Sequence, residues 1–368
     1  MGTSRTAASW PLAPHTGAKL ALLSAYLSAW FPILSSTSPQ RVFYIDGFAG
    51  PGRYSGGEDG SPVVALKALG LRGNLAKTTF EFHLVERRRR QAKALRENID
   101  ALRVQKLVPH NAIIHIHDQS AFSDAYETMI APELDRYPGA PTFALVDPFG
   151  WTGLPMAIMR DLMHRQRTEV MVNFMFEEIN RFLNHPDQPK NFDDLFGAPR
   201  WREGYDLIGP ARRTFLHDFY QEQLHTVAGA GYVRSFEMLN ERGASDYFLF
   251  FATNNRLGLS KMKEAMWRVD PGAGARFSDT TNFGQLVLLQ PEPDRHQLRR
   301  ILLTRFSSRR VRVQDIEQFV IEETGFHGSH YKKVLADLET TGHITIISPS
   351  PTRRKGTFAQ LSLVLEFS

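Results

Sequence analysis

Residues 42–52 read Val-Phe-Tyr-Ile-Asp-Gly-Phe-Ala-Gly-Pro-Gly. The first four are β-branched or aromatic and predict a short buried strand that ends at Asp46. The glycines that follow supply turn conformations and let a ligand approach the backbone closely. In an open parallel sheet, ligands bind beyond the carboxyl ends of the strands. The stretch therefore predicts an α/β fold with a ligand site directly after this strand.

Strands and helices alternate on both sides of this stretch, which is typical of a parallel sheet covered on both faces. Further strands are predicted over 79–85, 112–117, 142–146, 169–174, 232–239, 247–253 and 285–289. Helices are predicted over 15–31, 61–69, 87–102, 120–134, 155–165 and 260–268. Residues 177–230 contain no convincing strand and many aromatic side chains, so we expect a helical insertion that forms one wall of a substrate cleft.

The end of the chain predicts a separate module. Residues 291–294, Pro-Glu-Pro-Asp, are a linker signal. Two short helices over 313–323 and 329–340, the second capped by Ser329, precede a hairpin of 343–347 and 358–365. Helix, turn, helix and hairpin form the pattern of a winged helix-turn-helix. We therefore expect a core domain over 1–290 and a winged-helix domain over 295–368.

Charge and cysteine content limit the partners and the chemistry. The 368 residues include 44 Lys and Arg against 39 Asp and Glu, a net charge of +5. Residues 295–368 hold 12 basic and 7 acidic residues, which leaves 32 of each before them. A basic tail predicts an anionic partner, and the alternative is an ordinary solvated surface. The absence of cysteine excludes disulfides, thiolate metal sites and a cysteine nucleophile.

The longest apolar stretch, residues 20–34, is shorter than the roughly 20 residues that cross a bilayer. No basic segment leads into it and no small-residue cleavage site follows. We therefore expect a cytoplasmic protein with no membrane partner.

The first strand end carries a cofactor pattern. An acidic residue, three others and then Gly-x-Gly is the pattern of class I S-adenosylmethionine-dependent methyltransferases. It predicts that Asp46 pairs with the ammonium of the cofactor, while Gly47, Phe48, Gly50 and Gly52 pack against it. The Lys-Ser/Thr of a phosphate-binding P-loop is missing. The alternative is a simple tight turn.

The next two strand ends are acidic as well. Glu86 is predicted to accept hydrogen bonds from the ribose hydroxyls, unless it only favours the start of the following helix. Asp118 is predicted to bond the adenine amine. His115 and His117 share a strand face, but the sequence places no third ligand beside them, so no metal site is predicted.

The fourth strand ends in Asp147-Pro148-Phe149. The oxygen atoms of Asp147 and Pro148 are suited to accept hydrogen bonds from an amino group, and Phe149 offers a face on which a base can stack. These three residues are the predicted catalytic group, with Asn173 in the same cleft or in a capping role. The alternative is an Asp-Pro turn at a strand end.

Several blocks in order resemble the three-Cys-motif partner proteins, a family of predicted class I methyltransferases. They are Lys19-Leu20 to Pro32, residues 44–52, Gly60-Ser61-Pro62, residues 145–150, and Phe251-Ala252-Thr253 to Trp267. The resemblance implies a Rossmann-like class I methyltransferase core, often followed by a winged helix. It also implies a partner with three cysteines, similar to radical S-adenosylmethionine enzymes. Phe149-Gly150 departs from the aromatic pair that is commoner in amino-methyltransferases.

The winged helix is predicted to bind DNA or RNA through basic side chains of its second helix and its wing. They are His330, Lys332, Lys333, Arg353, Arg354 and Lys355. Such modules also dock proteins. The whole chain is thus predicted to be a methyltransferase acting on an amino group of nucleic acid. The rivals are an idle scaffold for the partner and a nuclease that holds magnesium with Asp46, Glu86, Asp118 and Asp147.

Overall fold

The computed structural model describes residues 11–37, 39–70, 78–278, 293–347 and 353–368. The chain forms two compact units. The first consists of residues 1–258 and 277–282, and the second of residues 259–276 and 283–368. The predicted strand over 285–289 and most of the predicted linker lie outside the described residues.

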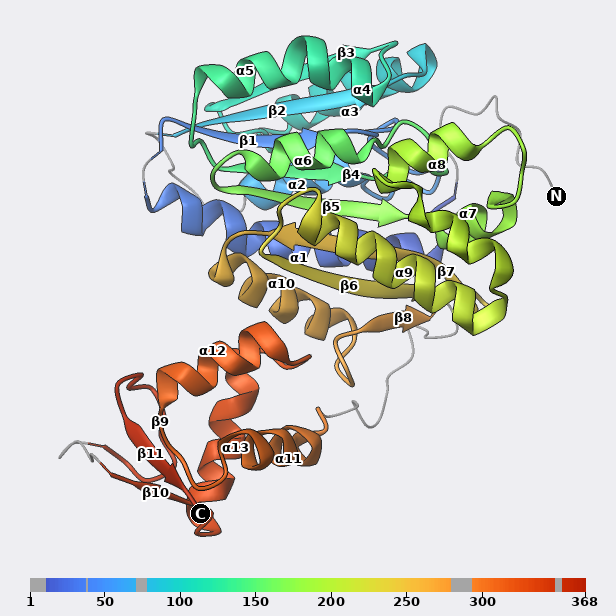
Figure 1. The fold of residues 1–368 in the computed structure, drawn as a ribbon. Helices are drawn as coiled ribbons and strands as arrows, with labels where there is room; N and C mark the ends of the chain where they lie inside the picture. Colours follow the sequence, from blue (N-terminus) through green and yellow to red (C-terminus); the bar gives the residue numbers. More distant parts are fainter. Residues whose placement is uncertain (1–10, 38, 71–77, 279–292, 348–352) are drawn as a thin grey trace. The chain divides into compact units, whose positions relative to one another are not determined.

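The first unit is built on an eight-stranded sheet with the order β3-β2-β1-β4-β5-β7-β6-β8 (Figure 1). Strands β1 to β5 are parallel, and β7 is antiparallel to both β5 and β6. The strands are β1 (Arg41–Asp46), β2 (Thr79–Glu86), β3 (Ala112–Asp118), β4 (Thr142–Val146), β5 (Thr168–Phe174), β6 (Tyr232–Leu239), β7 (Ser245–Thr253) and β8 (Arg276–Ser278).

This strand order, with one antiparallel strand beside β5, is that of a Rossmann-like class I methyltransferase core. The fold class predicted from the sequence is therefore confirmed. The antiparallel direction of β7 has a consequence for the site, because its first residues lie at the edge where β1, β4 and β5 end. In the register, Phe174 at the end of β5 is opposite Phe248 near the start of β7.

Helices cover both faces of the sheet (Figure 1). Helices α1, α2 and α3 lie on one face, and the elements from α4 to α9 pack on the other. Those on the first face are α1 (Pro14–Ser35), α2 (Ser61–Gly70) and α3 (Arg89–Val104). Those on the second are α4 (Phe122–Ala125), the π-helical turn η1 (Tyr126–Ile130), α5 (Ala131–Arg136), α6 (Met156–His164), α7 (Phe176–Phe182), α8 (Pro189–Phe196), the 3-10 helix η2 (Pro199–Asp206) and α9 (Gly209–Thr226).

Helix α1 is long and apolar enough to cross a membrane, but it is a core helix in this fold. Its Phe31 ring packs against Phe80 of β2, at a centroid distance of 5.6 Å. The hydroxyl of Tyr26 donates to the buried carboxylate of Glu169, which also accepts from Thr253 at 3.0 Å. These contacts hold α1 against the centre of the sheet.

The insertion over 177–230 is helical, as predicted, and it belongs to the hydrophobic core of the first unit. The ring of Phe192 on α8 is tilted against that of Trp201 on η2 at a centroid distance of 5.0 Å, and Phe196 stacks on Phe219 of α9 at 5.3 Å. Aromatic burial of this kind supplies a large apolar area per side chain. The insertion is therefore packed through its own aromatic side chains.

The second unit contains a winged helix-turn-helix, as predicted. Its elements are α11 (Arg295–Phe306), β9 (Arg310–Arg312), α12 (Val313–Glu323), α13 (Gly328–Thr340), β10 (Ile344–Ile346) and β11 (Val364–Phe367). The three strands form a sheet with the order β10-β11-β9. Helix α11 and strand β9 were not predicted. The second hairpin strand begins at Val364 rather than at Phe358, and its Leu365 pairs with both Ile346 and Val311. The N-cap of α13 is His327 rather than Ser329.

Helix α10 (Arg256–Val269) joins the second unit from Leu259 onward. The ammonium of Lys263 is buried and donates to three carbonyl oxygens at the end of α12, those of Val320, Ile321 and Thr324, at 2.9–3.0 Å. The indole of Trp267 donates to Gly325 at 3.0 Å. A cation at a helix carboxyl end satisfies carbonyls that have no partner in the helix. The compact second unit therefore begins before the boundary near residue 290 that we predicted.

Candidate functional site

Two adjoining pockets open at the carboxyl edge of the sheet in the first unit, and both are lined by Phe48 and Phe149. We name the first the glycine-loop pocket; it is lined by His15, Thr16, Lys19, Phe48, Ala49, Gly50, Pro51, Gly52, Arg53, Tyr54, Gly60, Ser61, Asp147, Pro148, Phe149, Asn173, Met175, Asp246 and Tyr247. We name the second the Glu86 pocket; it is lined by Gly47, Phe48, Val85, Glu86, Arg87, Arg88, Gln91, Ser120, Ala121, Phe122, Phe149, Thr152 and Gly153.

The loop after β1 forms the boundary between these pockets. Its backbone N–H groups at Gly47 and Ala49 donate to the carbonyls of Leu145 and Val85, both at 2.9 Å, so the loop is fixed to the ends of β4 and β2. Gly50 has φ +61°, and a Cβ atom there would meet no atom within 4 Å. The loop thus presents bare backbone to the pocket at the position that the sequence predicted for cofactor contact.

Asp46 is completely buried beneath this loop and lines neither pocket. The N–H of Phe48 donates to its Oδ1 at 3.2 Å, and the Tyr44 hydroxyl lies 3.4 Å from its Oδ2. Burial raises the pKa of Asp46 to about 7, and the charge of Asp147 adds to this effect, although hydrogen bonds from Ser61 and Phe48 oppose it. A positive charge in the glycine-loop pocket would favour the ionised form of Asp46 without touching it.

Glu86 lines the second pocket and is 7% exposed. Its Oε1 accepts from the backbone N–H of Arg88 at 2.6 Å, and burial raises its pKa. Asp118 lies opposite Glu86 in the register of β2 and β3 but lines neither pocket. It forms an ion pair with Arg96 at 2.7 Å. The structure therefore brings Glu86, and not Asp118, to a pocket wall.

Asp147, Pro148 and Phe149 all line the glycine-loop pocket. Lys19 donates to Oδ2 of Asp147, and the Asn173 amide donates to Oδ1 at 2.7 Å. Oδ1 of Asn173 is buried in this wall without a hydrogen-bond partner. The wall thus combines a paired carboxylate with an acceptor that is ready for a donor on a ligand.

Several polar side chains of this pocket were not assigned to it from the sequence, among them Lys19, Asp246 and Tyr247. Lys19 was recognisable as a lysine between two buried residues of an apolar helix. Asp246 and Tyr247 begin β7, and their place follows only from the antiparallel direction of that strand. Residues 177–230, all of them described, line neither of these two pockets, and a substrate cleft walled by the insertion stays a prediction.

The six basic side chains predicted to meet nucleic acid differ in their exposure. Lys332, Lys333, Arg354 and Lys355 are exposed. His330 is instead buried, with its ring 4.4 Å from that of Trp267, and burial followed by the neighbouring His327 lowers its pKa to about 3.

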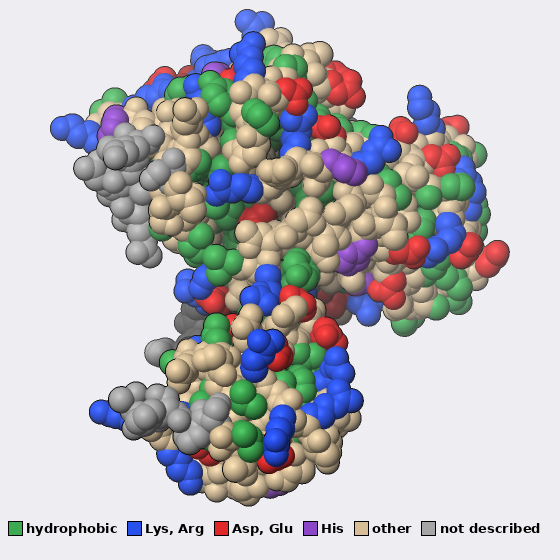
Figure 2. Space-filling view, turned by 60° about the vertical axis from the view of Figure 1, so that its left-hand side comes forward, with side chains coloured by type: hydrophobic (Ala, Val, Ile, Leu, Met, Phe, Trp, Pro, Cys, Tyr) green, Lys and Arg blue, Asp and Glu red, His purple; other side chains and the backbone are tan. Residues whose placement is uncertain are grey.

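Arg353 forms a two-point ion pair with Glu339, at 2.8 and 2.6 Å, and its side chain is 10% exposed. It therefore holds the wing against α13. In the view of Figure 2, Lys and Arg side chains are interspersed with acidic ones over the visible surface. The exposed set of Lys332, Lys333, Arg354 and Lys355 remains as the predicted contact surface, and we refer to it as the basic set.

The four carboxylates considered for magnesium are all in the described part of the chain, and they do not form a group of ligand atoms around one point. Asp118 is paired with Arg96, and Asp147 with Lys19. The geometry therefore does not favour the nuclease.

A family model described as a GMT-like winged helix-turn-helix domain matches residues 277–351. No curated protein matches the chain.

Among solved structures, the chain is similar to Trm1 from Pyrococcus horikoshii, solved with S-adenosyl-L-methionine, at 13% identity and a TM-score of 0.35, over 72% of this chain and 61% of that one. It is similar to the METTL16 methyltransferase domain at 12% identity and a TM-score of 0.30, over 62% and 66%. It is also similar to the methyltransferase domain of bacterial CtHen1-C at 12% identity and a TM-score of 0.33, over 64% and 100%. The chain thus spans about three fifths of the Trm1 structure and 66% of the METTL16 domain. These scores are low, and the fold assignment rests on the strand order.

Proposed function

We propose that the first unit is an S-adenosylmethionine-dependent methyltransferase. The observation that carries the proposal is the pair of adjoining pockets at the carboxyl edge of a sheet with the methyltransferase strand order. The Glu86 pocket has a volume of about 570 Å³, which suits the nucleoside part of the cofactor. Glu86 would accept from the ribose hydroxyls, and the bare backbone at Gly50 would face the amino-acid part.

In this proposal Asp46 acts through the floor of the glycine-loop pocket. Its buried carboxylate would stabilise a cation in that pocket at short range through a medium of low dielectric constant. It would also keep the loop in place through the Phe48 N–H. Asp46 is thus a positioning residue, and Glu86 is a contact residue.

The methyl acceptor in this proposal is an amino group. The bound cofactor supplies a methyl group on a good leaving group, so the protein mainly has to align the acceptor. Oδ1 of Asn173 and the carboxylate of Asp147 would accept its N–H bonds and orient the nitrogen lone pair. Phe149, which is 65% exposed, offers an aromatic face for a planar base. Nucleic acid is therefore the acceptor class that we propose.

Calorimetry with S-adenosylmethionine tests the cofactor site. We expect binding by the full chain, and binding weakened by ten-fold or more in Glu86→Gln and in Asp46→Asn, which keeps the Phe48 contact but removes the charge. Glu58→Gln is the matched control, because Glu58 is exposed in the same loop and lines neither pocket. No binding by the folded chain would overturn the methyltransferase and leave the scaffold.

A radiolabelled transfer assay with nucleic acid from cell extract tests the acceptor. We expect Asn173→Ala to reduce transfer while cofactor binding persists. Transfer to protein only would reject nucleic acid as the acceptor. One feature favours the scaffold as a second candidate: both oxygens of Asp147 already accept hydrogen bonds, from Lys19 and Asn173. A chain that binds the cofactor and transfers no methyl group would support it.

The basic set is proposed to hold the nucleic acid. We expect Lys332→Ala/Lys333→Ala and Arg354→Ala/Lys355→Ala each to weaken binding and to flatten its salt dependence by about one unit of slope per lost phosphate contact. Lys93→Ala/Arg103→Ala is the control, since these exposed residues lie on α3. Point variants are preferable to deletion of 295–368, because deletion would expose Trp267 and Lys263 of α10. Equal binding by all three pairs would reject the assignment.

The resemblance to three-Cys-motif partner proteins adds a partner with an iron–sulfur cluster to the proposal. The absence of cysteine in this chain is compatible with redox chemistry in a second protein. Co-purification of this chain with a tagged three-cysteine protein would test the partnership, and separate elution of the two at micromolar concentration would contradict it.

A further inference from the structure

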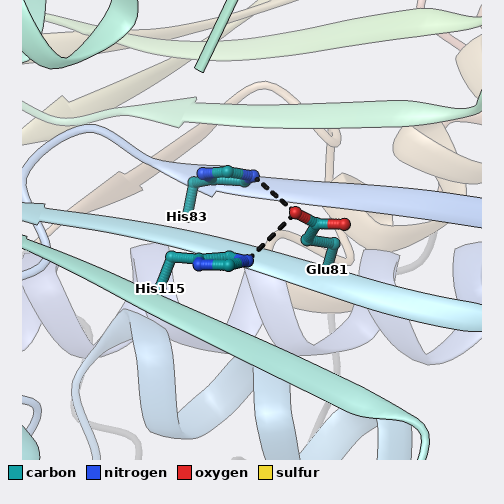
Figure 3. Close-up of side chains that lie close together, drawn as sticks. All are labelled: Glu81, His83 and His115. Carbon is teal, nitrogen blue, oxygen red and sulfur yellow. Dashed lines mark ion pairs between the residues drawn. The ribbon is translucent and has the colours of Figure 1, made fainter. Parts of the chain in front are cut away.

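A second polar cluster lies midway along the two strands at the β3 edge of the sheet, away from both pockets. It consists of Glu81 and His83 on β2 and His115 on β3, and we call it the Glu81 cluster (Figure 3). Glu81 and His83 are two residues apart and share a face of the strand, and His83 is directly opposite His115 in the parallel register. The two imidazole rings stack at 4.9 Å. The register between the two strands therefore brings one carboxylate and two imidazoles close together.

The ligand atoms converge on one carboxylate oxygen. Nε2 of His115 lies 3.0 Å from Oε1 of Glu81, and Nε2 of His83 lies 3.4 Å from the same oxygen (Figure 3). In a tetrahedral site with metal–ligand distances of 2.0–2.1 Å, neighbouring ligand atoms are about 3.3 Å apart. These two separations are close to the edges of such a tetrahedron, and the ligand atoms of all three residues lie within 4.8 Å of one another.

Glu81 and His83 are also oriented by hydrogen-bonding neighbours. Arg41 donates to Oε2 of Glu81 and leaves Oε1 to face the imidazoles. Nδ1 of His83 lies 3.0 Å from Nε2 of His117. Metal-binding side chains are commonly held in this way by hydrogen bonds on their far side. Arg41 and His117 therefore have the place of outer supports rather than of ligands.

One atom of the cluster lacks a partner. Nε2 of His83 is buried, makes no hydrogen bond, and points at Oε1 of Glu81 in a side chain that is 4% exposed. If Nδ1 of His83 donates to His117, Nε2 presents a lone pair to the carboxylate oxygen. Two acceptors then face each other across 3.4 Å, and a cation between them satisfies both.

We propose that Glu81, His83 and His115 form a binding site for a divalent cation of the zinc class, with one coordination position open to water. Two imidazoles and one carboxylate suit zinc or cobalt better than magnesium or calcium, which prefer oxygen ligands. His115 is 43% exposed on the outermost strand β3, which gives the ion a path from solvent. The bound ion would fasten β3 to β2. This proposal is independent of methyl transfer.

The sequence did not predict this site. In the sequence, His115 and His117 share a strand face, but no third ligand is placed beside them. The structure gives His117 the outer position and supplies Glu81 and His83 from the adjacent strand.

Cobalt titration of the full chain, purified without a histidine tag and stripped with a chelator, tests the proposal. We expect one equivalent of Co²⁺ to bind with a visible absorption band typical of four-coordination, and Zn²⁺ to displace it. His115→Ala should weaken binding by 100-fold or more, and His117→Gln by about 10- to 100-fold. His110→Ala, at an exposed histidine outside the cluster, should change nothing.

A thermal melt of each variant without metal separates lost binding from lost folding. His115 is half-exposed, so its alanine variant is expected to fold, and His115→Gln is the second variant. Zn²⁺ should raise the melting temperature of the parent chain and of His110→Ala, and not that of His115→Ala. Absence of the cobalt band from the folded parent chain, or the same band in His115→Ala, would overturn the proposal. S-adenosylmethionine binding should persist in His115→Ala, which distinguishes failure of this site from failure of the methyltransferase.

Discussion

Asp46 and Glu81 are buried carboxylates on the neighbouring strands β1 and β2, and their pKa values are shifted in opposite directions. Asp46 is surrounded by hydroxyls, a backbone N–H and the charge of Asp147, and burial raises its pKa to about 7. Burial would also raise the pKa of Glu81, but the hydrogen bond from His115 and the guanidinium of Arg41 hold it well below its usual range. The neighbours of Glu81 on β1 and β3 thus neutralise its carboxylate, whereas no counter-charge among the described residues neutralises Asp46 at the carboxyl edge. A perturbed carboxylate of the second kind is typical of a ligand site.

The largest expected effect comes from removing the charge of Glu81. Glu81→Gln leaves Arg41 and the imidazoles without their anion, and breaking a buried ion pair by removing one partner costs about 3–5 kcal/mol. We expect the free energy of unfolding, measured with urea, to fall by about 3 kcal/mol. Glu97→Gln, which breaks an exposed pair with Lys93, should change it by less than about 0.5 kcal/mol. Equal effects of the two variants would remove the contrast on which the comparison rests.

Replacing the carboxylate of Asp46 by an amide is expected to have the opposite effect and to stabilise the protein. Asp46→Asn removes a buried charge that no cation of the described residues neutralises, so the ligand-free chain should gain about 1–2 kcal/mol of stability at pH 8. Urea unfolding of the ligand-free protein measures this gain. Destabilisation by more than about 1 kcal/mol would show that Asp46 is already neutralised.

A smaller expected effect is the pH dependence of the difference in unfolding free energy between the parent chain and Asp46→Asn. The pKa of Asp46 is raised from 3.8 to about 7, so the folded state holds its proton in a window where the unfolded state has lost it. Its contribution to stability is complete below about pH 4 and is lost as the pH rises through 7. Between pH 6 and pH 8 the parent chain should lose about 1 kcal/mol relative to Asp46→Asn. Parallel stability curves for the two proteins over this range would contradict the shift.

Local sequence patterns predict the elements whose burial pattern is complete. Strand β4 is buried at all five positions, and it begins and ends where we predicted. Helix α12 also has the predicted bounds. By contrast, α11 was missed although Asp294 caps it and Leu298, Leu302 and Phe306 repeat at every fourth position. The basic residues between them obscured an otherwise ordinary helical pattern.

Site residues that stand near the end of a strand in the sequence could be predicted. Those that reach the site through the direction or register of strand pairing could not. Phe48, Gly50 and Glu86 come directly after strands, so the alternation of strands and helices places them at one edge. Asp246 reaches the same edge only because β7 runs antiparallel. Glu81 meets His115 only because of the register between β2 and β3, which no local pattern contains. From the sequence, His330 and Arg353 were predicted to be surface cations. In the structure, Trp267 packs against His330, and Glu339 forms an ion pair with Arg353.

The central claim is that a cation bound in the glycine-loop pocket stabilises the ionised form of the buried Asp46 carboxylate. Calorimetry of S-adenosylmethionine binding at pH 6, in buffers with different heats of ionisation, measures the protons released on binding. We predict that the parent chain releases more protons than Asp46→Asn, because the bound cation favours the ionised carboxylate, and that the difference disappears at pH 8. Equal proton release by the two proteins at pH 6 would contradict the claim.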